Sequence, residues 1–369
     1  EYPEKCEIRS YKPTTKGNYV QVRRVMAALE EAEKPLICIG GGVFAAHAEN
    51  EIRELADLMQ IPVITTMMGI SVFPDDDQLF CGMIGTHGVK MANAAVNECD
   101  VLFLVGARVG DRAVKTPLAL EKTTKIIHID IDPAEIGKNI GADLPLVGDA
   151  KLVLQQMTEL AKPMKHDEWI AHIKTLGGER KYVEPAKGTV NPRVFIDKLA
   201  KKMPANVTVV ADVGQNQIWT CTEYKFRKEG RLLTSGGMGT MGYSVPAAIG
   251  AKMADDSRAT VAICGDGAFQ MSFMELATAV QFGVDIKVVV MTNNRLGMVR
   301  ELQTNGYHDR QTAVFLDGSP DFIKLAEAYG IPAMRVYDDD TMEKGVEMLA
   351  EHKGICLVEV VVDKDMPTL

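Results

Sequence analysis

The sequence predicts an α/β protein built from two doubly wound parallel-sheet domains. Short runs of Val, Ile and Leu alternate with amphipathic helical stretches, and these runs are apolar throughout instead of alternating with polar residues. Such strands are typical of a parallel sheet covered by helices on both faces. A chain of 369 residues is also too long for one ordinary hydrophobic core, so we expect two domains.

The first domain is expected over residues 1–180, with its linker included. Its strands are predicted at Leu36–Ile39, Val63–Thr66, Val101–Val105 and Ile126–Ile131. The stretch Asn50–Met59 has apolar residues at helical spacing and predicts an amphipathic helix. After Lys151 the pattern weakens, with one helix marked by His166, Trp169 and Ile173. A crossing segment between the domains is then indicated by Gly177-Gly178, Pro185 and Gly188.

The second domain is expected over residues 181–369. Its strands are predicted at Val207–Ala211, Leu232–Thr234, Thr260–Cys264, Ile286–Met291 and Cys356–Val362. This pattern is again doubly wound, and in such sheets ligands bind at the carboxyl ends of the strands. The residues that directly follow each strand are therefore the candidates for a functional site.

Composition excludes several classes of protein. A net charge of −9 and a sequence pI of about 5.4 argue against nucleic-acid binding, which needs clustered basic surface. No apolar run is long enough to cross a bilayer. The seven cysteines form no CxxC pair, so we expect buried, reduced thiols and a cytoplasmic location. The chain starts at Glu1 with no signal peptide, and we expect it to begin inside a longer protein.

Residues that suit a metal and a diphosphate follow two strands of the second domain. Gly265-Asp266-Gly267-Ala268 comes directly after one strand, where its glycines let backbone N–H groups approach an anion. The Asp266 carboxylate is a hard oxygen ligand for Mg²⁺. Ser272 and Glu275 have capping-box spacing and predict a helix to about Gln281, which Gly283 can end. The next strand leads into Thr292-Asn293-Asn294.

Asp266 and Asn293 are expected to meet at one edge of the sheet. They lie 27 positions apart, and each follows one of two strands that are predicted to be parallel neighbours. Alone, Gly-Asp-Gly is most often only a turn, and Asn-Asn is most often a polar loop. Together, with one helix between them, they favour a shared site for Mg²⁺ and a diphosphate.

These residues resemble the signature of thiamine-diphosphate enzymes, and the neighbouring sequence is similar to the large catalytic subunit of acetolactate synthase. The matching segments are Asp212-Val-Gly-Gln215, Thr234-Ser-Gly-Gly-Met-Gly-Thr-Met-Gly-Tyr243, Pro246-Ala-Ala-Ile-Gly250, Gly297-Met298-Val299, Gly85-Thr-His-Gly88, Gly106-Ala-Arg108 and Asp111-Arg112. The resemblance covers essentially the whole chain and implies the central and C-terminal domains of a three-domain subunit.

The resemblance implies a metal site and a cofactor site. Alignment through Gly297-Met298-Val299 places Asn293, rather than Asn294, at the family's metal-binding Asn; the ligands would be Asp266, Asn293 and the Arg295 carbonyl. Gly239 and Met241 would be the catalytic positions: Met241 as the apolar wedge that keeps the cofactor's rings folded together, and the Gly239 carbonyl as acceptor of a hydrogen bond from the cofactor's 4′-nitrogen. Plain core packing is the competing role for Met241. The backbone at Gly267 and Ala268, with the Gln215 side chain, would hold the diphosphate. The implied thiamine-diphosphate site comprises Gln215, Asn216, Gly239, Met241, Gly265, Asp266, Gly267, Ala268, Asn293, Gly297 and Met298.

The implied activity is that of a transferase of branched-chain amino acid biosynthesis. Pyruvate would be decarboxylated and joined to a second 2-oxoacid, giving 2-acetolactate by chemistry that the cofactor carries. The family works as a homodimer or tetramer with the active site at the subunit interface, sometimes with a small regulatory subunit. Its cofactor-activating Glu belongs to an N-terminal domain that this chain lacks, so we expect the chain to be inactive alone.

Three positions depart from the family pattern. Asn216 stands where the family usually has His, and we expect it still to donate to phosphate. Leu302 replaces a Trp that lines the pocket for the second 2-oxoacid, so Met298 and Leu302 become the candidate substrate-pocket residues. Gly110 replaces an Asp in the first domain.

The first domain carries a weaker dinucleotide pattern. Gly40-Gly41-Gly42 follows a strand without completing G-x-G-x-x-G, and a tight turn explains it as well. Arg108 and Arg112 suit phosphates, and Asp130 suits a ribose hydroxyl. The resemblance implies that FAD binds here, lined by Gly40, Gly41, Gly42, Thr66, Met67, His87, Gly106, Ala107, Arg108, Arg112, Asp130 and Asp149.

Three alternatives stay open. Another carboligase or decarboxylase of the same cofactor class, such as a glyoxylate carboligase, would share the diphosphate site and differ around Met298 and Leu302. A nicotinamide dehydrogenase is suggested only by Gly40–Gly42. A non-catalytic cofactor-binding fragment is the third. Binding of NADH instead of thiamine diphosphate would favour the dehydrogenase, and titration of the cofactor with and without Mg²⁺ separates the fragment from the enzymes.

Overall fold

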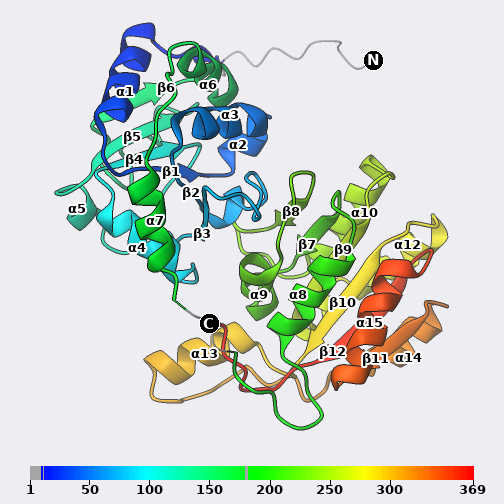
Figure 1. Ribbon diagram of the computed structural model, residues 1–369. Helices are drawn as coiled ribbons and strands as arrows, with labels where there is room; N and C mark the ends of the chain where they lie inside the picture. Colours follow the sequence, from blue (N-terminus) through cyan, green and yellow to red (C-terminus); the bar gives the residue numbers. More distant parts are fainter. Residues whose placement is uncertain (1–9, 11, 179–181) are drawn as a thin grey trace. The chain divides into compact units, whose positions relative to one another are not determined.

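The computed structural model describes residue 10, residues 12–178 and residues 182–369. The chain forms two compact units: Glu1–Phe73 with Asp77–Gly178, and Pro74–Asp76 with Glu179–Leu369 (Figure 1). Each unit contains one six-stranded sheet in which every pairing is parallel, flanked by helices. The predicted fold class, two doubly wound α/β domains, is confirmed.

The sheet of the first unit has the strand order β3-β2-β1-β4-β5-β6. Its strands are β1 Pro35–Ile39, β2 Val63–Thr65, β3 Phe80–Met83, β4 Val101–Val105, β5 Lys125–Asp130 and β6 Leu144–Val147. The four predicted strands are confirmed to within one residue at each end. The two edge strands, β3 and β6, were not predicted, because edge strands are only partly buried and lack a continuous apolar run.

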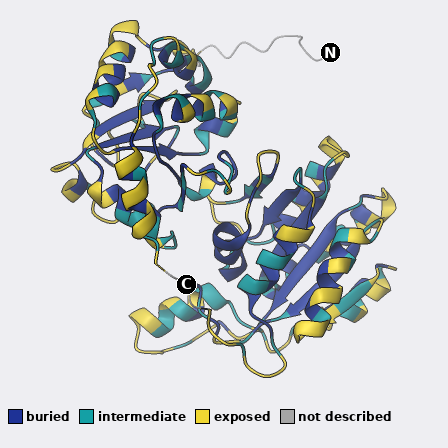
Figure 2. Ribbon diagram, in the orientation of Figure 1, coloured by how far each residue is buried: buried dark blue, intermediate teal, exposed yellow. Residues whose placement is uncertain are grey.

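Helices cover both faces of this sheet. They are α1 Tyr19–Glu31, α2 Gly42–Ala45, α3 Glu49–Met59, the 3₁₀ turn η1 Met67–Gly69, α4 Lys90–Glu98, α5 Pro117–Leu120, α6 Ala150–Thr158 and α7 Asp167–Thr175. Alternate residues of β4 enter two separate cores: Phe103 packs with residues of α1, α3 and α6, whereas Leu102 and Leu104 pack with α4 and α7. The central strands of both sheets are buried in Figure 2, which explains their uninterrupted apolar runs.

The sheet of the second unit has the strand order β11-β12-β10-β9-β7-β8. Its strands are β7 Thr208–Ala211, β8 Arg231–Thr234, β9 Thr260–Gly265, β10 Lys287–Thr292, β11 Ala333–Val336 and β12 Cys356–Val361. Edge strand β11 was not predicted; its Arg335 is part of an ion pair with Glu359 on β12 and interrupts the apolar pattern. The direction of the strand order reverses between β7 and β9, where ligands bind in folds of this type.

One helix start predicted in the second unit is wrong. The helices of this unit are α8 Pro192–Lys202, α9 Gln215–Glu223, α10 Ser244–Ala254, α11 Asp266–Gln270, the 3₁₀ turn η2 Phe273–Glu275, α12 Leu276–Gln281, α13 Gly297–Gly306, α14 Phe322–Ala328 and α15 Asp339–Glu351. The capping box at Ser272 was wrong: its hydroxyl makes no cap hydrogen bond, and α12 begins only at Leu276. Gly283, at φ +61°, follows the end of α12 as expected.

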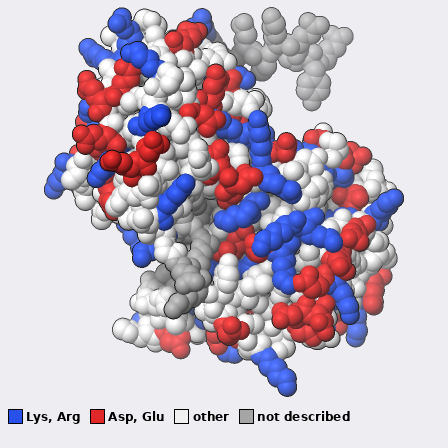
Figure 3. Space-filling model, viewed as in Figure 1, with Lys and Arg blue, Asp and Glu red and all other residues white. Residues whose placement is uncertain are grey.

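The surface carries both signs of charge. Lys and Arg side chains are interleaved with Asp and Glu over the face drawn in Figure 3. Among the residues that the structure describes, no helix combines the length and the apolar character needed to span a membrane.

Candidate cofactor and metal site

The second unit has a cavity of about 280 Å³ at the carboxyl ends of β7, β9 and β10. It lies where the strand order reverses, as the rule for doubly wound sheets requires. The structure gathers there most of the residues predicted for the site: Gln215, Asn216, Gly239, Met241, Gly265, Asp266, Gly267, Ala268, Asn293, Arg295, Gly297 and Met298. Val213, Gly214, Trp219, Met291, Leu296 and Val299 also line the cavity and were not predicted.

Asp266 joins the two strand ends at the cavity wall. It directly follows β9, and its side chain is 1% exposed. Its Oδ2 accepts hydrogen bonds from the N–H groups of Asn293 (3.1 Å) and Asn294 (2.6 Å), and its Oδ1 accepts one from Gly267 (2.8 Å). Burial raises the pKa of Asp266 from 3.8 to about 6, although these three donors oppose the shift. The predicted meeting of the two strand ends is therefore realised.

Asn293 presents an amide beside that carboxylate. Its Oδ1 accepts a hydrogen bond from the Arg295 N–H (3.1 Å), and its Nδ2 donates to Gln215 Oε1 (3.2 Å). The following residue, Asn294, has φ +53°, a left-handed conformation that Asn adopts more readily than most residues. Asn293 lines the cavity and Asn294 does not; the choice of Asn293 as the metal ligand stays a prediction.

The donor set suits a hard cation. The Asp266 carboxylate is buried, and no Lys, Arg or His of the described chain forms an ion pair with it, so a cation bound there would compensate its charge. Within the described residues no three His, Cys, Asp or Glu side chains gather as a metal-binding group. One carboxylate with amide and carbonyl oxygens leaves positions for phosphate oxygens and water, as is usual for Mg²⁺.

Two glycines leave space that side chains of the site occupy. A Cβ at position 267 would lie 2.9 Å from Leu296 Cδ2 and 3.3 Å from Met241 Cε, so Met241 reaches across to the Gly267 turn. A Cβ at position 297 would lie 1.9 Å from Gln215 Oε1. Gly239, at φ +67°, adopts a backbone conformation that favours glycine.

Asp212 anchors the Gly239–Met241 loop to the end of β7, a role that the sequence did not reveal. Its carboxylate is fully buried and accepts hydrogen bonds from the N–H groups of Val213 (2.9 Å), Gly242 (3.0 Å) and Ser244 (2.8 Å). An acidic residue directly after an apolar strand was the available signal, as it was for Asp266.

The side-chain amides of α9 are already engaged. The Nδ2 of Asn216 donates to the carbonyls of Asp212 (2.8 Å) and Ile263 (3.2 Å), which join β7 to β9. The Nε2 of Gln215 donates to Met366, Thr368 and Glu301. Donation from either side chain to a phosphate stays a prediction, since it would require exchange of these partners.

The two predicted substrate-pocket residues are separated. Met298, in the first turn of α13, lines the cavity. Leu302, one turn later, is 63% exposed and is not part of the cavity wall in this unit.

The first unit brings its glycine turns together at the reversal between β1 and β4. The Gly40 N–H donates to the Val105 carbonyl (2.9 Å), and the Gly42 N–H donates to the Gly106 carbonyl (3.0 Å). A Cβ on Gly40 would lie 2.1 Å from the Gly106 oxygen. The loops that contain Gly40–Gly42 and Gly106 are therefore in direct backbone contact, at the end of the sheet where a dinucleotide binds in this fold.

Other residues predicted for FAD lie around that end of the sheet. Thr66 follows β2 with Met67 in η1, Asp130 ends β5, and Asp149 caps α6 by accepting from the Leu152 N–H (3.1 Å). The Thr86 N–H donates to the Arg112 carbonyl (2.8 Å), so the segment that contains His87 lies beside Arg112. Arg108 and Arg112 are exposed.

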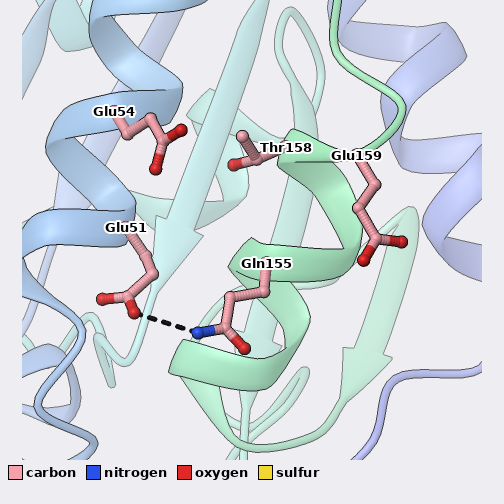
Figure 4. Close-up of a pocket in the computed structure, with 5 residues that line it drawn as sticks. All are labelled: Glu51, Glu54, Gln155, Thr158 and Glu159. Carbon is pink, nitrogen blue, oxygen red and sulfur yellow. Dashed lines mark hydrogen bonds between the residues drawn. The ribbon is translucent and has the colours of Figure 1, made fainter.

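A second hollow in the first unit has different chemistry. It is lined by Glu51 and Glu54 of α3 and by Gln155, Thr158 and Glu159 of α6 (Figure 4). Gln155 Nε2 donates to Glu51 Oε1 (3.1 Å), and Lys151 Nζ lies 3.4 Å from the same oxygen. Three carboxylates make this hollow unsuitable for a phosphate.

Comparison with known proteins connects the cavity to a family. Residues 212–360 match the family model described as the thiamine pyrophosphate enzyme C-terminal TPP-binding domain, and residues 22–157 match the thiamine pyrophosphate enzyme central domain. The chain is 39% identical to a probable acetolactate synthase large subunit of Methanocaldococcus jannaschii, over 98% of the chain and 63% of that protein.

Two further relatives carry related names. An acetolactate synthase isozyme 3 large subunit of Escherichia coli is 35% identical, over 98% of the chain and 65% of that protein. An acetolactate synthase of Mycobacterium bovis is 38% identical, over 98% of the chain and 60% of that protein. The chain thus spans less than two thirds of the length of these relatives. It belongs to the thiamine pyrophosphate enzyme family, with that family's central domain followed by its C-terminal domain.

Proposed function

We propose that this chain is the central and C-terminal part of an acetolactate synthase large subunit. It would take part in Mg²⁺- and thiamine-diphosphate-dependent decarboxylation of pyruvate and ligation to a second 2-oxoacid. The observation that carries the proposal is the junction of Asp266 and Asn293 inside the cavity, in a segment that matches a TPP-binding domain.

Asp266, Asn293 and the Arg295 carbonyl would hold Mg²⁺, and the backbone at Gly267 and Ala268 would hold the diphosphate oxygens. Support comes from burial: an ionised carboxylate at 1% exposure is costly unless a cation or strong donors compensate it. The metal would add a charge opposite to that of Asp266, in an oxygen environment that Mg²⁺ prefers.

Gly239 and Met241 would hold the thiazolium and pyrimidine ends of the cofactor. The reach of Met241 to the Gly267 turn supports a wedge between them, and Asp212 fixes the loop that carries both. When bound, thiamine diphosphate supplies the carbanion stabilisation that decarboxylation of a 2-oxoacid needs. The protein groups orient it and exclude water.

For the first unit we propose FAD binding at the crossing of Gly40–Gly42 with Gly106. The close backbone contact there and the exposed guanidinium groups of Arg108 and Arg112 support a phosphate-bearing ligand. Further parts of the proposal are assembly into a homo-oligomer, a small regulatory subunit and a cytoplasmic location. The six described cysteines, all free and buried, are compatible with a reducing compartment.

Calorimetric titration of the 369-residue chain with thiamine diphosphate, with and without Mg²⁺, tests the proposal. We expect binding that requires Mg²⁺ and that is lost in Asp266→Ala. The matched control is Asp340→Ala, the same substitution at an exposed position of α15 in the same unit. Equal binding by wild type and Asp266→Ala would refute the metal assignment.

A further inference from the structure

The amide of Gln215 links the candidate metal ligand to a distant segment of the chain. Gln215 is 4% exposed, at the start of α9. Its Nε2 donates to the Met366 carbonyl (2.9 Å), Thr368 Oγ1 (3.2 Å) and Glu301 Oε2 (3.3 Å). Its Oε1 accepts from Asn293 Nδ2 (3.2 Å). One side chain therefore contacts α13, the C-terminal segment and the loop after β10.

We propose that Gln215 is a positioning residue that fixes the orientation of the Asn293 amide, and that Glu301 with the segment Met366–Thr368 fixes Gln215 in turn. The inference rests on the proposed function, because it assigns Asn293 Oδ1 to the metal. It differs from the expectation that the Gln215 side chain holds the diphosphate.

The orientation of Gln215 follows from the chemistry of its partners. A backbone carbonyl and a carboxylate only accept hydrogen bonds, so the atom of Gln215 that faces Met366 and Glu301 must be the amide nitrogen. The amide oxygen then faces Asn293, whose neighbouring atom must be its nitrogen. Asn293 Oδ1 is left on the opposite side of its amide, beside the Arg295 N–H.

The position of Gln215 is also fixed by packing. Gly297 lies so close that a Cβ there would be 1.9 Å from Oε1. The C-terminal segment is held by other contacts, since Trp219 Nε1 donates to the Pro367 carbonyl (3.1 Å) and Arg193 Nη2 donates to the Thr368 carbonyl (2.6 Å). Thr368 itself is 2% exposed, and its hydroxyl and N–H both donate to Glu301.

This network leaves little capacity for a phosphate. The Gln215 amide has two protons and already faces three acceptors. The side chain therefore acts on the metal through Asn293.

A double-mutant cycle distinguishes positioning from direct contact. The probe is thiamine diphosphate, and the measured quantity is the Mg²⁺ concentration at half-maximal binding, for wild type, Gln215→Ala, Asn293→Ala and the double variant. We expect Gln215→Ala to raise this midpoint about tenfold, the effect of one buried hydrogen bond, and to have no further effect in Asn293→Ala. Equal, additive effects in both backgrounds would overturn the proposal.

A second pair of variants tests the far end of the network and covers the case in which Gln215→Ala does not fold. Thr368→Val removes one acceptor of the Gln215 amide, and Thr368→Ser retains the hydroxyl. We expect a higher Mg²⁺ midpoint for Thr368→Val, a wild-type midpoint for Thr368→Ser, and no effect of either in Asn293→Ala. A wild-type Mg²⁺ midpoint for both Thr368→Val and Thr368→Ser would overturn the proposal that this segment fixes Gln215.

The two proposals fail in different ways. If the wild-type chain shows no Mg²⁺-dependent binding of thiamine diphosphate, the proposed function fails and the positioning role fails with it. If the wild type binds and Asp266→Ala does not, but the effects of Gln215→Ala and Asn293→Ala add, only the positioning role is refuted.

Discussion

Two glycines at opposite ends of α13 give a prediction in which the same substitution has opposite effects. Gly297 and Gly306 are the first and last residues of the helix. A Cβ at Gly306 meets no heavy atom within 4 Å, whereas one at Gly297 lies 1.9 Å from Gln215 Oε1. Ordinary contact begins at 3.4 Å, so the Gln215 amide would have to retreat by about 1.5 Å.

The energies can be estimated from these contacts. Alanine is favoured over glycine in a helix by up to about 1 kcal/mol, so Gly306→Ala should stabilise the second unit by zero to about 1 kcal/mol. Gly297→Ala should destabilise it by about 1–2 kcal/mol, because displacement of the buried Gln215 amide leaves Asn293 Nδ2 without its acceptor, at about 1–3 kcal/mol. The Mg²⁺ midpoint for cofactor binding should rise about tenfold in Gly297→Ala alone.

The assay is urea unfolding of the second unit by tryptophan fluorescence. The chain has two Trp residues, Trp169 in the first unit and Trp219 beside the cavity. In a Trp169→Phe background the signal comes from Trp219, so the transition of the second unit is followed separately. Equal unfolding free energies and equal Mg²⁺ midpoints for Gly297→Ala and Gly306→Ala would show that position 297 does not contact the Gln215 amide.

Three further predictions concern Asp266, Gly40 and Cys38. The raised pKa of Asp266, about 6 against 3.8, means that the metal-free folded chain binds a proton more tightly than the unfolded chain, so its stability falls as pH rises from 3.8 to 6. Relative to Asp266→Asn, metal-free wild type should therefore lose about 2 kcal/mol between pH 4.5 and pH 7.5, and a parallel pH profile would contradict this. Gly40→Ala should destabilise the first unit by about 1–3 kcal/mol, because its Cβ would lie 2.1 Å from the Gly106 oxygen. Gly110→Ala is the control, since a Cβ there has nothing within 4 Å and should leave the melting temperature unchanged. Equal melting temperatures for the two variants would count against the close contact between Gly40 and Gly106. Burial raises the pKa of the Cys38 thiol to about 12, so iodoacetamide at pH 8 should modify Cys38 only after denaturation. Peptide mass spectrometry detects the modification, and rapid labelling of the native chain would show that β1 is accessible to the reagent.

The central strands of both sheets and the edge strand β8 could be predicted, whereas the edge strands β3, β6 and β11 could not. β4 and β10 are buried along their whole length, so their apolar runs are unbroken. β3, β6 and β11 are partly exposed and carry residues such as Gly82, Pro145 and Arg335, which a search for apolar runs rejects. Their pairing depends on neighbours distant in sequence.

The start of α11 at Asp266 escaped prediction for a tertiary reason. Gly-Asp-Gly-Ala has poor helix propensity and a turn-like composition. The helix begins there because Asp266 hydrogen bonds to the backbone of the loop after β10, which fixes the end of β9. The pattern at Ser272 pointed to a cap that the folded chain does not use.

The site could be predicted only where its residues follow adjacent strands. Asp266 and Asn293 follow strands that are adjacent in the sheet, so sequence order was enough to bring them together. Two of the partners of Gln215 lie 151 and 153 positions away, in a segment without a recognisable pattern. Leu302 was assigned to a pocket by resemblance, and its 63% exposure shows that helix position alone does not direct it into this cavity.

The central claim is that Asp266 and Asn293 share one divalent cation. The most direct measurement is a crystal structure of the chain with thiamine diphosphate and Mn²⁺ in place of Mg²⁺, with the cation located by its anomalous scattering. We expect one peak within about 2.0–2.3 Å of an Asp266 carboxylate oxygen, Asn293 Oδ1 and the Arg295 carbonyl, with the Asn293 nitrogen still facing Gln215. A peak bound through Asn294, or a cation remote from Asp266, would contradict it.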